Sequence, residues 1–140
     1  MKKWYFASRM RHQEKIKEVC DFLTAQGEQV VCRWVYEQSL APYKQNQEKI
    51  ATLAVDSIQG VIEADVFVLI SDPEGTDMFV ELGAALAAAV PAEKKIYNVG
   101  SYSKRSLLQT HPSIIHAASL PEVFKAEQIN YSKYIIPSFE

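Results

Sequence analysis

Segments typical of strands and segments typical of helices alternate along this chain, and this alternation limits the possible folds more than any other feature. The strand-like runs are rich in β-branched and aromatic residues, while the helical segments repeat apolar residues at helical spacing and tend to end at Gly or Pro. Five strands alternating with helices predict an α/β fold in which a parallel sheet is covered on both faces. The expected strands are 4–7, 30–36, 64–71, 95–99 and 113–118, and the expected helices are 12–26, 45–63, 77–90 and 121–128.

The remaining segments are expected to be two loops and a C-terminal tail. The loops cover 39–43 and the long polar stretch 100–112. A length of 140 residues fits one domain, which we place at 1–128. The tail, 129–140, is too apolar to be solvated, so we expect it to pack on its own subunit or on another. Its apolar and aromatic residues are Tyr131, Tyr134, Ile135, Ile136 and Phe139.

Composition removes several classes of function. The net charge of −2 lacks the basic excess of a protein that binds polymeric nucleic acid. The apolar runs are too short for a membrane span, and the N-terminal run is too short for a secretory signal. Cys20 and Cys32 lack CxxC spacing and are too few for a zinc site. We therefore expect a cytoplasmic protein that binds neither polymeric nucleic acid nor a membrane.

Ligands of open α/β sheets bind beyond the carboxyl ends of the strands. Three segments should meet there, namely 8–11, 71–77 and 100–112. None of them is a standard nucleotide loop, because the chain has neither GxxxxGK[ST] nor GxGxxG. ATPase and ordinary dinucleotide-binding functions therefore lose most of their support.

Glu81 is the most unusual residue of the expected helices. From Met78 to Val90 the chain reads MFVELGAALAAAV, and Glu81 is the single charged residue. A helix that is apolar all round is expected to be buried, and a buried carboxylate needs a partner or a cavity. Its place early in the helix favours an ionised carboxylate, as a nucleophile requires. The alternative is a glutamate that caps the first turn.

The order and spacing of several short segments resemble the nucleoside 2-deoxyribosyltransferase family, including its nucleotide N-glycosidase branch. The resemblance covers residues 5 to about 99. It rests on four segments, Tyr5-Phe6-Ala7-Ser8, Glu63-Ala64-Asp65, Gly75-Thr76 and Glu81-Leu82-Gly83-Ala84-Ala85. A weaker match lies at His111-Pro112-Ser113.

This resemblance implies a fold, a reaction and two catalytic residues. The fold would be a flavodoxin-like three-layer sandwich with a five-stranded parallel sheet in the order 2-1-3-4-5. Glu81 would attack the anomeric carbon of a nucleoside and expel the base, and water or a second base would resolve the glycosyl-enzyme ester. Tyr5 would orient Glu81. No cofactor or metal is implied, and the partners would be a small nucleoside or nucleotide and further copies of this chain in a homo-oligomer.

Two further segments could bind the substrate. Ser8, Arg9 and Arg11 precede a helix and match the loop that holds a phosphate in the nucleotide-cleaving branch. The alternative is a pair of solvated surface arginines. Gly75 and Thr76 could lie against the sugar, and Asp77 could face the same cavity as Glu81. The alternative is that these three residues form an ordinary loop and helix cap.

One position departs from the family pattern. Family members carry a base-contacting aspartate eight residues before the aspartate that matches Asp65, and this position is Ser57 here. Projected at about 100° per residue, Ser57 falls on the apolar face of its helix and Asp56 on the polar face. We expect Ser57 to face inward and Asp56 to face solvent, so a proton donor would be missing.

Two other functions remain open. The cytokinin-activating phosphoribohydrolases also pair a Gly-Thr turn with a later glutamate, but their preceding glycine pair is missing here. A nucleotide-binding or sensor module with a decayed site is favoured by Ser57 and opposed by Tyr5 and Glu81. The aromatic and imidazole side chains elsewhere are expected to be structural, and the tail tyrosines could reach a neighbour's site or pack locally. They are His111, His116, Trp34, Tyr36, Tyr131 and Tyr134.

Overall fold

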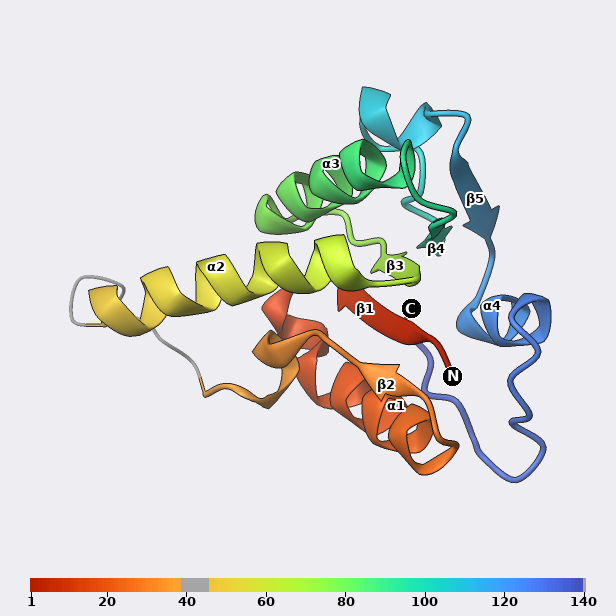
Figure 1. Ribbon diagram of the computed structural model, residues 1–140. Helices are drawn as coiled ribbons and strands as arrows, with labels where there is room; N and C mark the ends of the chain where they lie inside the picture. Colours follow the sequence, from red (N-terminus) through yellow and green to blue (C-terminus); the bar gives the residue numbers. More distant parts are fainter. Residues whose placement is uncertain (39–45, 140) are drawn as a thin grey trace.

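The computed structural model describes residues 1–38 and 46–139 as a three-layer α/β sandwich (Figure 1). Its parallel sheet has the order β2-β1-β3-β4-β5, which confirms the flavodoxin-like topology. The expected loop 39–43 lies outside the described residues. The strands are β1 (Lys3–Ala7), β2 (Gln29–Val30), β3 (Val66–Ile70), β4 (Lys95–Val99) and β5 (Ile114–Ala117).

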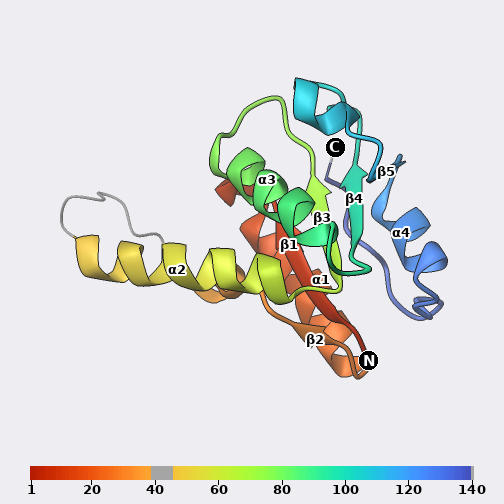
Figure 2. The same ribbon diagram turned by 45° about the horizontal axis from the view of Figure 1, so that its top comes forward.

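Helices cover both faces of the sheet. The helices are α1 (Gln13–Ala25), α2 (Gln47–Glu63), α3 (Asp77–Ala89) and α4 (Leu120–Ala126). The helices α2 and α3 lie on one face, and α1 and α4 lie on the other, as the two views show (Figures 1 and 2). No helix among the described residues is long and apolar enough to cross a membrane.

Alternating side chains of β1 divide the core between these two layers. Trp4 packs edge-on against Phe124 of α4, at 6.0 Å between ring centroids. Tyr5 points to the other face, where its ring stacks on Phe67 of β3. Because successive strand residues face opposite sides, β1 presents Tyr5 to the layer of α2 and α3. At the start of the sheet, the Asp65 carboxylate accepts a hydrogen bond from the Lys3 amide at 2.8 Å, so Asp65 has a structural role there.

The second strand is much shorter than expected. The β-branched and aromatic run 30–36 predicted a strand, but β2 ends at Val30 and Arg33–Tyr36 is a 3₁₀ helix, η2. The indole of Trp34 donates a hydrogen bond to the Phe6 carbonyl at 2.7 Å, and the Gln13 amide donates to the Trp34 carbonyl at 2.8 Å. These side-chain hydrogen bonds are found where a longer strand would make backbone hydrogen bonds to β1. The strand propensity of residues 30–36 cannot predict such contacts.

The polar stretch after β4 also contains local structure. A 3₁₀ helix, η4 (Leu107–Thr110), lies within it, and Gln109 of that turn is buried. The C-terminal tail runs back along α1 of its own chain. There Tyr134 stacks on Phe22 with 4.2 Å between ring centroids, and Lys15 Nζ donates a hydrogen bond to the Ser138 carbonyl at 2.6 Å.

Candidate active site

Tyr5 and Glu81 meet between β1 and α3. The Tyr5 hydroxyl donates a short hydrogen bond to Glu81 Oε2. Tyr5 is fully buried on β1, and Glu81 projects from the second turn of α3 toward the same face of the sheet. The structure therefore brings together the two residues that the sequence resemblance paired.

The ionisation of Glu81 differs from the sequence expectation. Burial raises the pKa of Glu81 to about 7, the hydrogen bond from Tyr5 acts in the opposite direction, and the charge of Asp77 adds to the rise. The helix N-terminus was expected to keep the carboxylate ionised. A helix end supplies only about 0.3–1 kcal/mol, less than the desolvation of a buried carboxylate, so Glu81 is only partly ionised at neutral pH.

Tyr5 remains protonated throughout the physiological range. Burial, followed by the charge of Glu81, raises the pKa of Tyr5 far above its usual value. Tyr5 is therefore a permanent hydrogen-bond donor to Glu81 rather than an acid or base. Such a fixed donor holds one carboxylate oxygen and favours the ionised form of the carboxyl group.

Helix α3 is less buried than its composition implied. Only its inner face, formed by Met78, Leu82 and Ala85, is fully buried. Val80, next to Glu81 in sequence, is 63% exposed. The expectation of a helix buried all round is wrong for the isolated chain, because α3 packs on the sheet and on α2 with one side only.

Ser57 lies beside the Tyr5 hydroxyl. A hydrogen bond between the two side chains lowers the pKa of Tyr5, against the stronger effects that raise it. One turn later, Gly60 lets α2 approach the sheet closely, because a Cβ on Gly60 would lie 2.4 Å from the Val31 carbonyl oxygen and 3.1 Å from the Tyr5 ring. Ser57 therefore faces inward, as its helical phase predicted.

Asp56 points away from this group. Its carboxylate pairs with Arg33 of η2, with 3.0 Å between Asp56 Oδ2 and Arg33 Nη1. The side chain of Asp56 is 32% exposed, so it is held against η2 and is not fully solvated. The outward direction agrees with the helical phase, and the ion pair is an addition that the sequence did not suggest.

The turn before α3 brings glycine close to an arginine. Gly75 has φ +112°, and a Cβ there would lie 2.9 Å from Arg9 Cγ, so a side chain at this position would be strained and crowded. Thr76 precedes the helix without a side-chain cap. Asp77 lies one turn before Glu81, close enough for its charge to raise the pKa of Glu81.

The arginines of the loop after β1 are engaged by carboxylates. Arg9 pairs with Glu74 at 2.8 Å and lies 3.6 Å from Asp72. Arg11 pairs with Asp72 at 2.6 Å. The Ser8 hydroxyl donates to the Ile70 carbonyl at 2.9 Å. Both arginines are therefore paired with carboxylates and are not simply solvated. Arg9 also lies against Gly75, whereas Arg11 is paired with Asp72.

Asp72 is the residue of this region that the sequence analysis missed. Its side chain is fully buried and accepts hydrogen bonds from Arg11, from His12 at 2.9 Å and from the Glu74 amide at 2.9 Å. Burial opposes ionisation, but these hydrogen bonds outweigh it and lower the pKa of Asp72. The available signal was an acidic residue directly after a buried strand, at the edge where arginines also lie.

The remaining candidates have local contacts. His111 accepts a hydrogen bond from the Ser113 amide at 3.1 Å, and His116 is exposed on the edge strand β5. Trp34 is a packing residue, and Tyr36 donates to Asp21 at 2.8 Å. Tyr131 packs at an angle to Phe124 of its own chain. No group of His, Cys, Asp or Glu within 1–38 and 46–139 could hold a metal ion.

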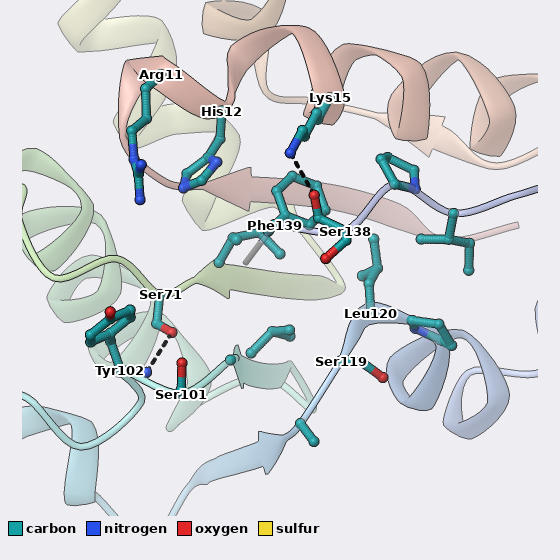
Figure 3. Close-up of a pocket in the computed structure, with 17 residues that line it drawn as sticks. Arg11, His12, Lys15, Ser71, Ser101, Tyr102, Ser119, Leu120, Ser138 and Phe139 are labelled. Carbon is teal, nitrogen blue, oxygen red and sulfur yellow. Dashed lines mark hydrogen bonds between the residues drawn. The ribbon is translucent and has the colours of Figure 1, made fainter.

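The structure has two hollows near the candidate residues. One has a volume of about 740 Å³ and lies at the carboxyl ends of β3 and β4 (Figure 3). The other, of about 660 Å³, lies between η2 and α2 and includes Asp56 in its wall. Neither is lined by Tyr5 or Glu81.

Comparison with known proteins bears on the fold. No protein-family model matches the sequence, and no curated protein matches it. Among solved structures, the chain is similar to a CMP N-glycosidase, BcmB, of Clostridium botulinum, with a TM-score of 0.54 and 21% identity. The match covers 92% of this chain and 100% of that one. The two proteins therefore share a fold along nearly their whole lengths, and that fold supports the resemblance seen in the sequence.

Proposed function

We propose that this protein cleaves or transfers the N-glycosidic bond of a nucleoside or nucleoside 5′-monophosphate through a glutamyl glycosyl-enzyme intermediate. The hydrogen bond between Tyr5 and Glu81 carries the proposal. It joins a buried, permanently protonated donor to a carboxyl group whose pKa is about 7, so a nucleophile is available at neutral pH. A fold shared with a CMP N-glycosidase supports the same reaction class.

In the first step, a carboxylate oxygen of Glu81 forms a bond to the anomeric carbon. The bond from that carbon to the base nitrogen breaks, and its electron pair leaves with the base. In the second step, water or the nitrogen of another base attacks the same carbon and releases the Glu81 carboxylate, and the proton that the attacking group loses balances the proton that the departed base takes up. Two displacements retain the configuration at this carbon.

The other residues are proposed to place the substrate. Gly75 and Thr76 would lie along the sugar, Asp77 would face the same space, and Ser57 would contact the leaving base. Arg9, which lies against Gly75, is the arginine that we propose for a 5′-phosphate. Ser8 would support the loop through its hydrogen bond to Ile70. Arg11, which was grouped with Arg9 in the sequence interpretation, is held by Asp72 at 2.6 Å and lines the hollow of about 740 Å³.

The test measures release of free base by chromatography from a panel of deoxynucleosides, ribonucleosides and their 5′-monophosphates. Glu81→Gln should preserve the fold and abolish release, and Tyr5→Phe should lower it by about 10²-fold or more. Glu63→Gln is the matched control, because Glu63 is an exposed carboxylate at the end of α2. Undiminished release by Glu81→Gln would refute the proposed mechanism.

A nucleotide-binding module without turnover is the second candidate. Ser57 favours it, because a serine hydroxyl beside Tyr5 is a poor proton donor for a leaving base. This candidate predicts saturable nucleotide binding with no base released by the wild-type chain. The same panel, measured for binding and for release, separates the two candidates.

A further inference from the structure

Two cysteines that the proposed reaction does not use lie side by side in the core. Cys20 is on α1, and Cys32 follows β2 and directly precedes η2. Both are free thiols, each no more than 1% exposed, and their Sγ atoms are 3.9 Å apart. They are the two cysteines of the chain. Their spacing is not that of a metal-binding or redox motif, so only the fold brings the two thiols together.

The segment that carries Cys32 has room to move toward α1. Backbone pairing of β2 with β1 ends at the Val31 amide, which donates to the Trp4 carbonyl at 2.9 Å. Cys32 comes directly after this hydrogen bond, outside the sheet and outside η2. The sulfurs of a disulfide are about 2.05 Å apart, so each sulfur has to move by about 1 Å. Because no regular element fixes Cys32, its backbone and side chain can supply this movement.

We propose that Cys20 and Cys32 form a reversible disulfide within the chain, with a small-molecule disulfide as the oxidant. The thiolate of one cysteine attacks a sulfur of the small disulfide, whose S–S bond breaks and releases one small thiolate. The thiolate of the other cysteine then attacks the protein sulfur of the mixed disulfide and releases the second small thiolate. Two cysteine thiols are oxidised and one small disulfide is reduced. The two protons that the cysteines lose pass to the two released thiolates.

Burial makes this pair slow to react in the folded chain. The thiolate is the attacking species, whereas the contact with the Cys32 sulfur, followed by burial, raises the pKa of the Cys20 thiol far above its usual value. Exchange therefore begins when the segment between β2 and η2 opens locally and admits the small disulfide. The pair responds to a sustained change in redox conditions and not to a brief one.

The disulfide also acts on α2. The 3₁₀ helix η2 packs against both α1 and α2, and it is the orange turn of Figure 1. On one side of Cys32, the Val31 carbonyl oxygen would lie 2.4 Å from a Cβ on Gly60, and on the other side Arg33 pairs with Asp56. Drawing Cys32 toward α1 pulls both neighbours away from α2. Any effect on base release rests on the proposed function, but disulfide formation does not.

Thiol labelling of the full chain in glutathione buffers tests this proposal. At each ratio of oxidised to reduced glutathione, equilibrium is approached from both the reduced and the oxidised chain. The samples are quenched with acid, free thiols are alkylated in denaturant, and the intact mass is measured. We expect both labels to be lost together, with a mass lower by two hydrogens and no bound glutathione. Excess dithiothreitol should restore both labels.

The same titration in urea shows whether the fold favours the disulfide. The native chain should favour it about tenfold or more over the unfolded chain, because a disulfide that stabilises the fold is stabilised by the fold to the same extent. The comparison uses the wild-type chain alone, so it does not depend on how well a variant folds.

Cys20→Ala and Cys32→Ala are the matched controls, with their fold confirmed by circular dichroism. Each should keep one thiol, which is either labelled or carries one glutathione, and neither should lose two hydrogens. The proposal is overturned if the native wild type stays fully labelled at every ratio, if each cysteine takes up glutathione, or if chains cross-link to each other. A disulfide that is no more favoured in the native chain than in urea also overturns it. This readout needs no base release, so its result is independent of the test of Glu81.

Discussion

Burial of Glu81 should lower the free energy of unfolding at and above neutral pH, because the buried carboxyl group then has to ionise. Its pKa is raised from 4.5 to about 7, so between these values the unfolded chain loses a proton that the folded chain keeps. Stability therefore falls as the pH rises through this window, by up to roughly 3 kcal/mol at about 1.36 kcal/mol per pKa unit. Glutamine cannot ionise and can still accept the hydrogen bond from Tyr5.

Glu81→Gln should therefore unfold at higher urea concentration than the wild type at about pH 8. The difference should be much smaller at about pH 5, where the folded wild-type carboxyl group is already protonated. Urea titrations followed by circular dichroism at both pH values measure it. A variant that is destabilised equally at both pH values would contradict the raised pKa of Glu81.

Ser57 decides how well a base can leave in the proposed reaction. It lies beside Tyr5, where relatives in the resembled family carry an aspartate, and it cannot protonate a base effectively. Ser57→Asp should raise base release from natural deoxynucleosides about tenfold or more, given the usual size of acid catalysis. Initial rates of release measure the effect.

Asp56→Asn is the control for this prediction, since Asp56 points to Arg33 and away from Tyr5. It should change the rate little. If Asp56→Asn removes activity while Ser57→Asp changes nothing, Asp56 is the functional carboxylate and α2 turns Asp56, not Ser57, toward Tyr5.

At the scale of elements, the close approach of α2 to the sheet depends on one glycine. A Cβ at Gly60 would lie 2.4 Å from the Val31 carbonyl oxygen, which is backbone and cannot rotate away. Gly60→Ala should push α2 outward and destabilise the protein by roughly 1–3 kcal/mol, as overpacking usually does. Base release should fall as well, because Ser57 and the Tyr5 ring lie at the same contact.

Gly83→Ala provides the comparison for Gly60→Ala. Nothing lies within 4 Å of a Cβ built at Gly83 of α3, so alanine there should be neutral or stabilising. Thermal unfolding of the two variants measures the contrast. Equal stabilities would show that α2 does not approach the sheet as closely as the structure has it.

The sequence predicted the helices and strands whose apolar pattern is visible within the segment itself. It did not predict the features that depend on contacts between residues far apart in the chain. Helices α1 and α2 follow from apolar spacing over many residues, α3 follows from a long apolar run that ends before Pro91, and β3 follows from a short apolar run. The extent of β2 could not be predicted, because the indole of Trp34 ends it by bonding to Phe6. The sheet order came from the family resemblance and not from the periodicity.

The same distinction applies to the candidate site. Tyr5 and Glu81 could be paired because both match short family segments, and Ser57 because helical phase is a local property. The group around Asp72 could not be found in this way. Its partners Arg11 and His12 come from a segment about sixty residues earlier, and only the parallel pairing of β1 with β3 brings them together.

At the scale of the whole molecule, three large apolar side chains of α2 and α3 remain exposed in the single chain. Val55 is 69% exposed and Val80 is 63% exposed, and Ile62 of α2 is also exposed. These side chains lie on the two helices that carry Ser57 and Glu81. A second copy of the chain on this face would bury these side chains.

The family resemblance implies a dimer or higher oligomer, and we predict that its contact includes this face. Light scattering coupled to size exclusion should give at least twice the monomer mass at micromolar concentration. Val80→Lys should shift the mass toward the monomer, because a lysine at an apolar contact loses its solvation. Ile115→Lys, on the edge strand β5, is the control and should leave the mass unchanged, since Ile115 is 42% exposed on a different part of the surface. A monomeric wild type would contradict the predicted oligomer. Dissociation by Ile115→Lys and not by Val80→Lys would place the contact on another part of the surface.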